Sequence, residues 1–337
     1  PAPAAAARKE QGGNVRRLLQ WCVCITAALT LGAGAALAQF PDRPVRLLVP
    51  YPPGGLVDIL ARTLQEPLSV ALGQPLIVEN KPGAAGGIAT RFVAQSKPDG
   101  YTLIFGNNGP SALLPLIQKD TGYDPVDDFA PISMIATAPM VLVVHKDVPV
   151  DNLKDFIAYA RQKAGAVTYS SAGIGALGHL TTELFAQMAD LKLIHVPYKG
   201  SAPAVMAVLD GEVQMYLSSP SDTLSAGLKA GKVKLLGVSP MSGSELVPGA
   251  SPIAAALPGF DVSIWYGVLA PKDTPPAVVE RLNKAFREVL AQPVLQSKFS
   301  SFGAVAGASA PAELSHRIVG EVAKWRGTIQ SAGIAIQ

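Results

Sequence analysis

Short apolar runs alternate with amphipathic runs along most of this chain, and this alternation is the feature that most limits its possible folds. The first three apolar runs are predicted strands, at 45–51, 75–80 and 102–106. Helical runs at 57–68 and 87–95 separate them, and the first carries leucines at i, i+4 and i+8 on one face. This β-α-β-α-β order predicts a parallel sheet with helices on both faces.

A second set of alternating elements follows the first. Its predicted strands lie at 139–149, 167–171, 193–198, 213–218 and 233–239. Its predicted helices lie at 152–163, 178–188, 202–209 and 223–230. Two helices of the tail, 277–291 and 311–330, are expected to cover the first domain.

Two similar strand-to-helix passages predict where the chain crosses between two domains. Each has an apolar strand, Lys-Asp, one further residue and a proline, and the crossings are placed near 140–145 and 265–270. The predicted domains are a discontinuous α/β lobe of residues 39–142 and 266–337 and a second α/β lobe of residues 143–265. Two such lobes enclose a cleft, and loops at the carboxyl ends of the strands are the candidate ligand loops.

Residues 1–38 have the composition of a secretory signal peptide. Basic residues precede an apolar stretch from Leu18 to Leu37, and Ala36-Leu37-Ala38 supplies the small-residue cleavage pattern. We expect cleavage after Ala38 and export to the periplasm, with a retained transmembrane anchor as the alternative. The pair Arg16-Arg17 leaves both the general secretory and the twin-arginine export routes open.

Removal of this segment changes the charge and the cysteine content. The formal net charge is +3 at pH 7, but the chain without residues 1–38 has equal numbers of basic and acidic residues. No bulk charge would then attract nucleic acid, and we expect no nucleic-acid partner and a monomer. Both cysteines, Cys22 and Cys24, lie in the segment, which excludes thiol chemistry in the predicted mature chain.

The first candidate loop follows the strand at 45–51. Gly54 and Gly55 lie between Tyr51 and Leu56, and Asp58 comes at the start of the next helix. Such a loop offers main-chain amides and a helix N-terminus to a carboxylate or phosphate. Asp58 either favours the helix dipole or accepts a hydrogen bond from the ligand, and we expect its side chain to face solvent.

Four further strand-to-helix loops offer neutral hydrogen-bonding groups. Their candidate residues are Lys81 in 81–87, Asn107 and Ser111 in 106–111, Ser171, Ala172, Gly173 and His179 in 170–179, and Tyr198 and Lys199 in 197–201. Turn formation explains the asparagines and glycines equally well, and a cap or core contact explains His179. Lys81 fits a solvated turn better than an anion site.

Catalytic and metal signatures are sparse in this sequence. The context of Ser171 is not Gly-x-Ser-x-Gly, and the histidines have no metal-ligand spacing. We therefore predict binding without turnover, with no catalytic residue, no cofactor and no metal. An enzyme that uses Asp58 or His179 is the less favoured alternative.

Several stretches together resemble the Bug-type (TctC) receptors of tripartite tricarboxylate transporters. They are VPYPPGGLVDILAR, LIVENKPGAAGGIAT, KPDGYTLIFG, SSAGIGALGH, VPYKGSAPAV and WYGVLAPKDTP, and they span nearly all of 41–337. The resemblance implies a two-domain periplasmic binding protein fold of type II, a Venus flytrap with two crossover strands. It implies a small mono- or dicarboxylate ligand. By the same resemblance, Tyr51, Gly54, Gly55 and Asp58 face the cleft from the first domain. The residues on the second domain's side are Ser171, Ala172, Gly173 and His179, with Tyr198 and Lys199 close by.

The resemblance also implies membrane transporter subunits as partners, with a sensor kinase as the alternative for an orphan receptor. The sequence does not name the ligand. Gln214 stands where the family usually has an acid, and Tyr51 and Leu56 also depart from the family pattern. These changes make ligand identity, rather than fold, the open question.

Overall fold

The structure is a computed structural model that describes residues 40–239, 244, 246–247, 249–331 and 333. The elements below all belong to the unit that begins at Arg43. The predicted signal peptide at 1–38 lies outside the described residues. Among the helices of the described part, none is both long and apolar enough to span a membrane.

The first sheet is built around the parallel strands that the sequence predicts. β1 (Val45–Val49) lies between β2 (Leu76–Asn80) and β3 (Thr102–Asn107), parallel to both. The sheet continues antiparallel from β3 to β9 (Ser263–Pro271) and from β9 to β4 (Phe129–His145). The short strand β10 (Val305–Ala306) also pairs with β4.

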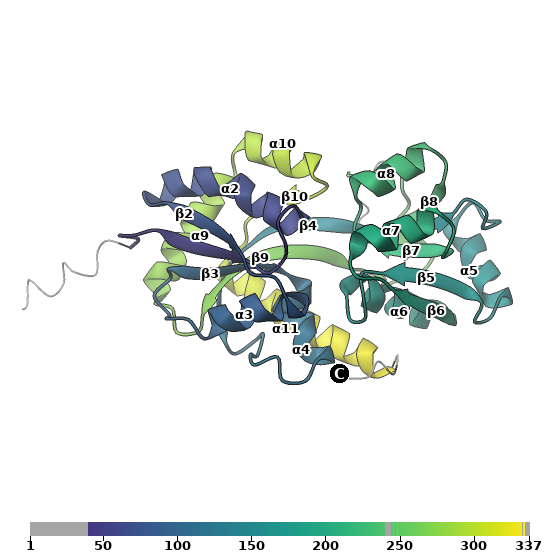
Figure 1. Cartoon of the computed structure of the whole chain (residues 1–337), viewed down its shortest axis with the longest axis horizontal. Helices are drawn as coiled ribbons and strands as arrows, with labels where there is room; N and C mark the ends of the chain where they lie inside the picture. Colours follow the sequence, from purple (N-terminus) through teal and green to yellow (C-terminus); the bar gives the residue numbers. More distant parts are fainter. Residues whose placement is uncertain (1–39, 240–243, 245, 248, 332, 334–337) are drawn as a thin grey trace, which may run out of the picture. The chain divides into compact units, whose positions relative to one another are not determined.

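Helices cover both faces of this sheet (Figure 1). α2 (Leu56–Leu72) and α9 (Pro276–Leu290) pack together on one face, and α3 (Gly87–Ala94) and α11 (Pro311–Ser331) cover the other. The leucines spaced along α2 are fully buried, which is why this segment folds as a core-facing helix. The remaining elements are η2 (Ala84–Gly86), η3 (Gly109–Leu113), α4 (Leu114–Ile117) and α10 (Pro293–Ser301), none of which is among the predicted helices.

Strand β4 takes part in two sheets, and Pro139 marks the change. Residues 129–139 pair with β9, whereas 140–145 pair with β8 (Val233–Ser239). The strand begins ten residues before the predicted 139, at Phe129. Prolines at 131 and 139 and two register shifts interrupt this part, so it lacks the regular alternation that identifies a strand.

The second sheet repeats the plan of the first. β5 (Val167–Ser171) lies parallel between β6 (Leu193–Pro197) and β7 (Met215–Ser218), and β7 joins β4 antiparallel. α7 (Ser201–Leu209) and α8 (Asp222–Lys229) share an apolar cluster with β4, β7 and β8. α5 (Leu153–Gln162) and α6 (Leu177–Ala189) lie on the other face, where Phe156 stacks on Phe185.

The chain has returned to the first sheet by Ser263, slightly before the predicted crossing at 265–270. Within the described residues, residues 263–271 pair only with β3 and with residues 129–139 of β4, both in the first sheet. The division into 39–142 with 266–337 and 143–265 stays a prediction.

Candidate functional site

The loop after β1 is organised by the carboxylate of Asp58. This side chain is only 3% exposed, so the expectation that it faces solvent is wrong. Its Oδ2 accepts the Gly54 amide at 2.9 Å, and its Oδ1 accepts Arg62 Nε at 2.9 Å and Asn80 Nδ2 at 2.8 Å. The amide of Gly54, expected to face a ligand, is therefore already engaged. Asp58 therefore stabilises the conformation of the loop from its buried side.

Asn80 and Arg62 are site-organising residues that the sequence analysis missed. Asn80 Nδ2 also donates to the Tyr51 carbonyl at 3.1 Å, and Arg62 Nη2 donates to Asn80 Oδ1 at 2.7 Å. Burial alone would raise the pKa of Asp58, but the hydrogen bonds from Gly54, Arg62 and Asn80 outweigh it and lower that pKa. The carboxylate is charged at neutral pH, and it binds the Gly54 amide directly and the Tyr51 carbonyl through Asn80.

The start of α2 leaves main-chain donors for a ligand. Gly55 is the N-cap residue, and no side chain caps the helix there. The first amides of a helix have no intrahelical carbonyl partner and carry a partial positive charge. Gly55 and its neighbour Gly54 are exposed and Leu56 is partly buried, so the helix begins at the protein surface.

The loop after β3 meets the loop after β1. Tyr51 Oη donates to Asn107 Oδ1 at 2.9 Å, and the Gly109 amide donates to the same oxygen at 3.2 Å. Burial raises the pKa of Tyr51 far above its usual range, against a smaller opposing effect of the Asn107 bond, so the phenol stays protonated. The structure thus brings Tyr51 and Asn107 together, as the site prediction requires.

Ser111 is fully buried, and its hydroxyl has no hydrogen-bond partner within the described residues. Asn108 is also buried, but its side chain bonds Trp265 N and Glu321 in the interior. Lys81, in the loop after β2, lies over the Phe92 ring at 4.8 Å.

The loop after β5 is held by two histidines. Ser171 Oγ lies 2.6 Å from His195 Nε2 and also bonds the main chain of Gly173. His179 Nδ1 accepts the Gly175 amide at 3.0 Å. Ser171, Gly173 and His195 therefore form one hydrogen-bonded group, and His179 with Gly175 forms a second; His195 is the member that the sequence analysis missed.

The two imidazoles stack on each other and on a tyrosine. The ring centroids of His179 and His195 are 4.0 Å apart with planes 10° apart, and the Tyr169 ring lies 4.8 Å from His195 and 6.5 Å from His179. The Tyr169 hydroxyl bonds Glu183. Desolvation lowers the pKa of both histidines to about 4, with a smaller contribution from His195 to the shift of His179, so both rings are neutral at pH 7.

We expect the free energy of unfolding to decrease between pH 6.5 and about pH 4 because of these histidines. Their pKa is near 6.5 in the unfolded chain and about 4 in the folded chain, so the unfolded chain binds more protons in this window. On the order of 1–2 kcal/mol per histidine should be lost between pH 7 and pH 5. Urea unfolding of the wild type and of His316→Asn, an exposed control, should show this loss, and equal stability at both pH values would contradict it.

The backbone amides on either side of Lys199 join the loop after β6 to the loop after β5. The Tyr198 amide donates to the Ser171 carbonyl at 3.0 Å, and the Gly200 amide donates to the Ala172 carbonyl at 3.2 Å. The Tyr198 hydroxyl instead bonds Glu212, and the Lys199 side chain is exposed. These bonds fix the backbone of the two loops side by side.

The two groups of loops approach each other at Ile117 and Gly175. A Cβ at Gly175 would lie 1.9 Å from Ile117 Cδ1, so the isoleucine at the end of α4 packs directly on this glycine. Gly175 has φ +77°, and its amide is the one that His179 accepts. The contact links a helix that follows β3 to the loop that follows β5.

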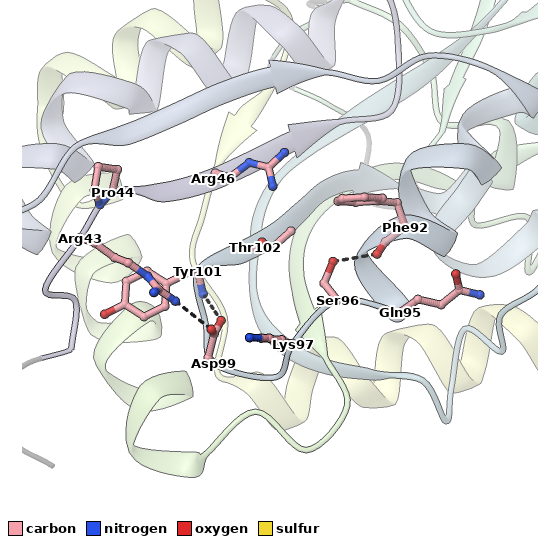
Figure 2. Close-up of a pocket in the computed structure, with 10 residues that line it drawn as sticks. All are labelled: Arg43, Pro44, Arg46, Phe92, Gln95, Ser96, Lys97, Asp99, Tyr101 and Thr102. Carbon is pink, nitrogen blue, oxygen red and sulfur yellow. Dashed lines mark hydrogen bonds and ion pairs between the residues drawn. The ribbon is translucent and has the colours of Figure 1, made fainter.

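A surface pocket of about 670 Å³ lies elsewhere, between β1, β3 and the end of α3 (Figure 2). No predicted site residue lines it. Arg43 bonds Asp99 at 2.9 Å, and Arg46 bonds Glu79 at 2.7 Å, so both guanidinium groups are already paired. This pocket is not the predicted site.

Solved structures of similar chains have the same fold. R. palustris Rpa4515 with adipate is 35% identical, with a TM-score of 0.77, and the match covers 88% of this chain and 99% of that one. The periplasmic binding protein BugD is 33% identical, with a TM-score of 0.75 and coverage of 88% and 100%. MatC from Rhodopseudomonas palustris with bound malate is 30% identical, with a TM-score of 0.74 and coverage of 86% and 100%. The predicted two-domain periplasmic binding protein fold is confirmed.

A family model described as tripartite tricarboxylate transporter family receptor matches residues 60–334. The family and the similar structures are solute-binding receptors, so the chain is a receptor and not an enzyme. The chain belongs to the tripartite tricarboxylate transporter receptor family, as its sequence motifs predict.

Proposed function

We propose that this receptor captures a small organic mono- or dicarboxylate between the loop after β1 and the loop after β5. It would do so in the periplasm and pass the acid to the membrane subunits of a tripartite transporter. The adipate and malate of two similar structures support a carboxylate as the ligand class.

One observation carries this proposal: α2 and α6 both begin without a side-chain cap, directly after glycine loops that buried side chains hold in shape. In the second sheet, α5 and α8 are capped by Asn152 and Ser221, whereas α6 and α7 are not. Uncapped helix N-termini supply amides and positive potential to an anion. The loops would therefore bind carboxylate oxygens with neutral donors.

A thermal-shift screen tests the ligand class. Adipate, malate, other mono- and dicarboxylates and the neutral diamide of adipic acid would each be added to the purified protein. A ligand that binds only the folded state raises the melting temperature, so at least one acid should raise it and the diamide should not. A panel of acids without effect, or an equal shift with the diamide, would contradict the proposal.

Gly55→Val should weaken carboxylate binding while the fold stays intact. Gly55 has φ −77° and ψ 163°, which suits valine, and the nearest atom to a Cβ there is the Pro52 carbonyl oxygen at 3.9 Å. The added side chain would cover the amides at the start of α2. Loss of one hydrogen bond to a charged ligand should cost about tenfold or more in affinity.

Calorimetry with the best acid from the screen measures this effect. Gly327→Val places the same side chain at an exposed glycine of α11 and is the matched control. Unchanged affinity in Gly55→Val would show that the loop is a purely structural turn.

A further inference from the structure

The stacked histidines bind the two ends of the loop after β5. His195 Nε2 pairs with Ser171 Oγ at 2.6 Å, where the strand ends, and His179 Nδ1 accepts the Gly175 amide at 3.0 Å, before the helix begins. His179 is 6% exposed, and Ser171 is fully buried. Because the rings are stacked 4.0 Å apart, neither can turn away without disturbing the other.

We propose that His179 and His195 are positioning residues that, as neutral rings, hold residues 171–175 in their ligand-binding shape, and that protonation in acid releases this loop. The inference rests on the proposed function, because it makes this loop one half of the carboxylate site. Affinity would then depend on pH through the protein as well as through the ligand.

The hydrogen-bond chemistry gives the direction of this effect. A histidine nitrogen accepts only when it carries no proton, so His179 must carry its hydrogen on Nε2. A proton on Nδ1 would place two donors face to face, because the Gly175 N–H points at the same atom. Two protonated rings 4.0 Å apart would also repel each other in a partly buried site.

The charged groups on neighbouring elements are directed elsewhere. Glu183 of α6 bonds the Tyr169 hydroxyl, and Lys199, in the turn after β6, is exposed. Lys324 of α11, which packs on α6, reaches the Asp261 carbonyl and the Trp325 ring. None of these contacts would stabilise an imidazolium in the stack.

Hydrogen exchange of the ligand-free protein tests the inference. Exchange of a peptide spanning 171–179 would be measured at pH 7.0 and pH 4.5 and corrected for intrinsic rates. Rings released by loop opening take up protons below about pH 6.5, so protection should fall about tenfold or more at pH 4.5. A peptide from 140–145 of β4 reports global unfolding, so the lower pH would be set where this peptide still exchanges more slowly than the 171–179 peptide.

A paired variant separates proton uptake from packing. In His179→Asn with His195→Gln, the amide oxygen can take the place of His179 Nδ1 as acceptor, the amide group can take the place of His195 Nε2 in either role, and neither amide titrates near pH 5. This variant should keep the loop protected at both pH values, whereas His316→Asn, an exposed control on α11, should behave like the wild type. Equal protection of the wild-type loop at both pH values, or an equal loss in the paired variant, would overturn the inference.

The outcome does not depend on the ligand. If no carboxylate binds, the proposed function fails while the exchange result still decides whether the histidines control the loop. If adipate binds, its affinity should fall more from pH 7.0 to pH 4.5 in the wild type than in the paired variant. Protonation of adipate itself is common to both proteins and cancels in this comparison.

Discussion

Asp58→Ala should lower the free energy of unfolding by about 2–3 kcal/mol and weaken carboxylate binding by about tenfold or more. The substitution removes an almost fully buried carboxylate that accepts three hydrogen bonds. The Gly54 amide and Asn80 Nδ2 would lose their acceptor, and the loop after β1 would lose its internal support. Urea unfolding and calorimetry with the best acid of the screen measure the two effects.

Two further variants test whether the effect comes from the buried carboxylate of Asp58. Glu66→Ala removes an exposed carboxylate from the same helix and should change neither quantity. Asp58→Asn keeps one acceptor oxygen and should fall between the wild type and the alanine variant. If Asp58→Ala lost affinity at full stability, Asp58 would be a ligand contact rather than the support of the loop.

Much of the fold could be predicted because its signal is local. Residues 57–68 show the helical period without any knowledge of partners, and Leu60, Leu64 and Leu68 are all buried in the structure. The first half of β4 could not be predicted in this way. Pro131 and Pro139 cannot donate to a strand ladder, and only pairing with β9 makes this segment a strand.

The candidate loops were predictable for the same local reason, because glycines directly after an apolar strand mark a turn into a helix. Their supports were not predictable. Asn80 lies 22 residues from Asp58, and His195 lies 24 residues from Ser171, each on a neighbouring parallel strand. His195 pairs with Tyr169 in the register of β5 and β6, and this register could not be predicted from the sequence. The polar partner of a loop is visible only once the strands are aligned.

Gly175→Ala should lower the free energy of unfolding by about 2–4 kcal/mol, the combined effect of an unfavourable backbone and a collision. Gly175 has φ +77°, and its new Cβ would lie 1.9 Å from Ile117 Cδ1 and 3.2 Å from Ile117 Cγ1. Ile117 is 8% exposed, so its side chain has little room to move away. Displacement of the loop would also disturb the Gly175 amide that His179 accepts, and carboxylate affinity should fall with stability.

Two further variants separate the collision from the backbone strain. Gly165→Ala has nearly the same φ, +75°, with no atom within 4 Å of the new Cβ, so it should cost only the strain, about 1–2 kcal/mol. Gly175→Ala combined with Ile117→Ala removes the colliding atoms. The double variant should therefore lose less free energy of unfolding than the two single variants lose in sum. A strictly additive double variant would mean that Ile117 and Gly175 are not in contact in solution. Coupling in stability together with recovered affinity would identify this contact as the point where the loops after β3 and β5 are held together around a bound acid.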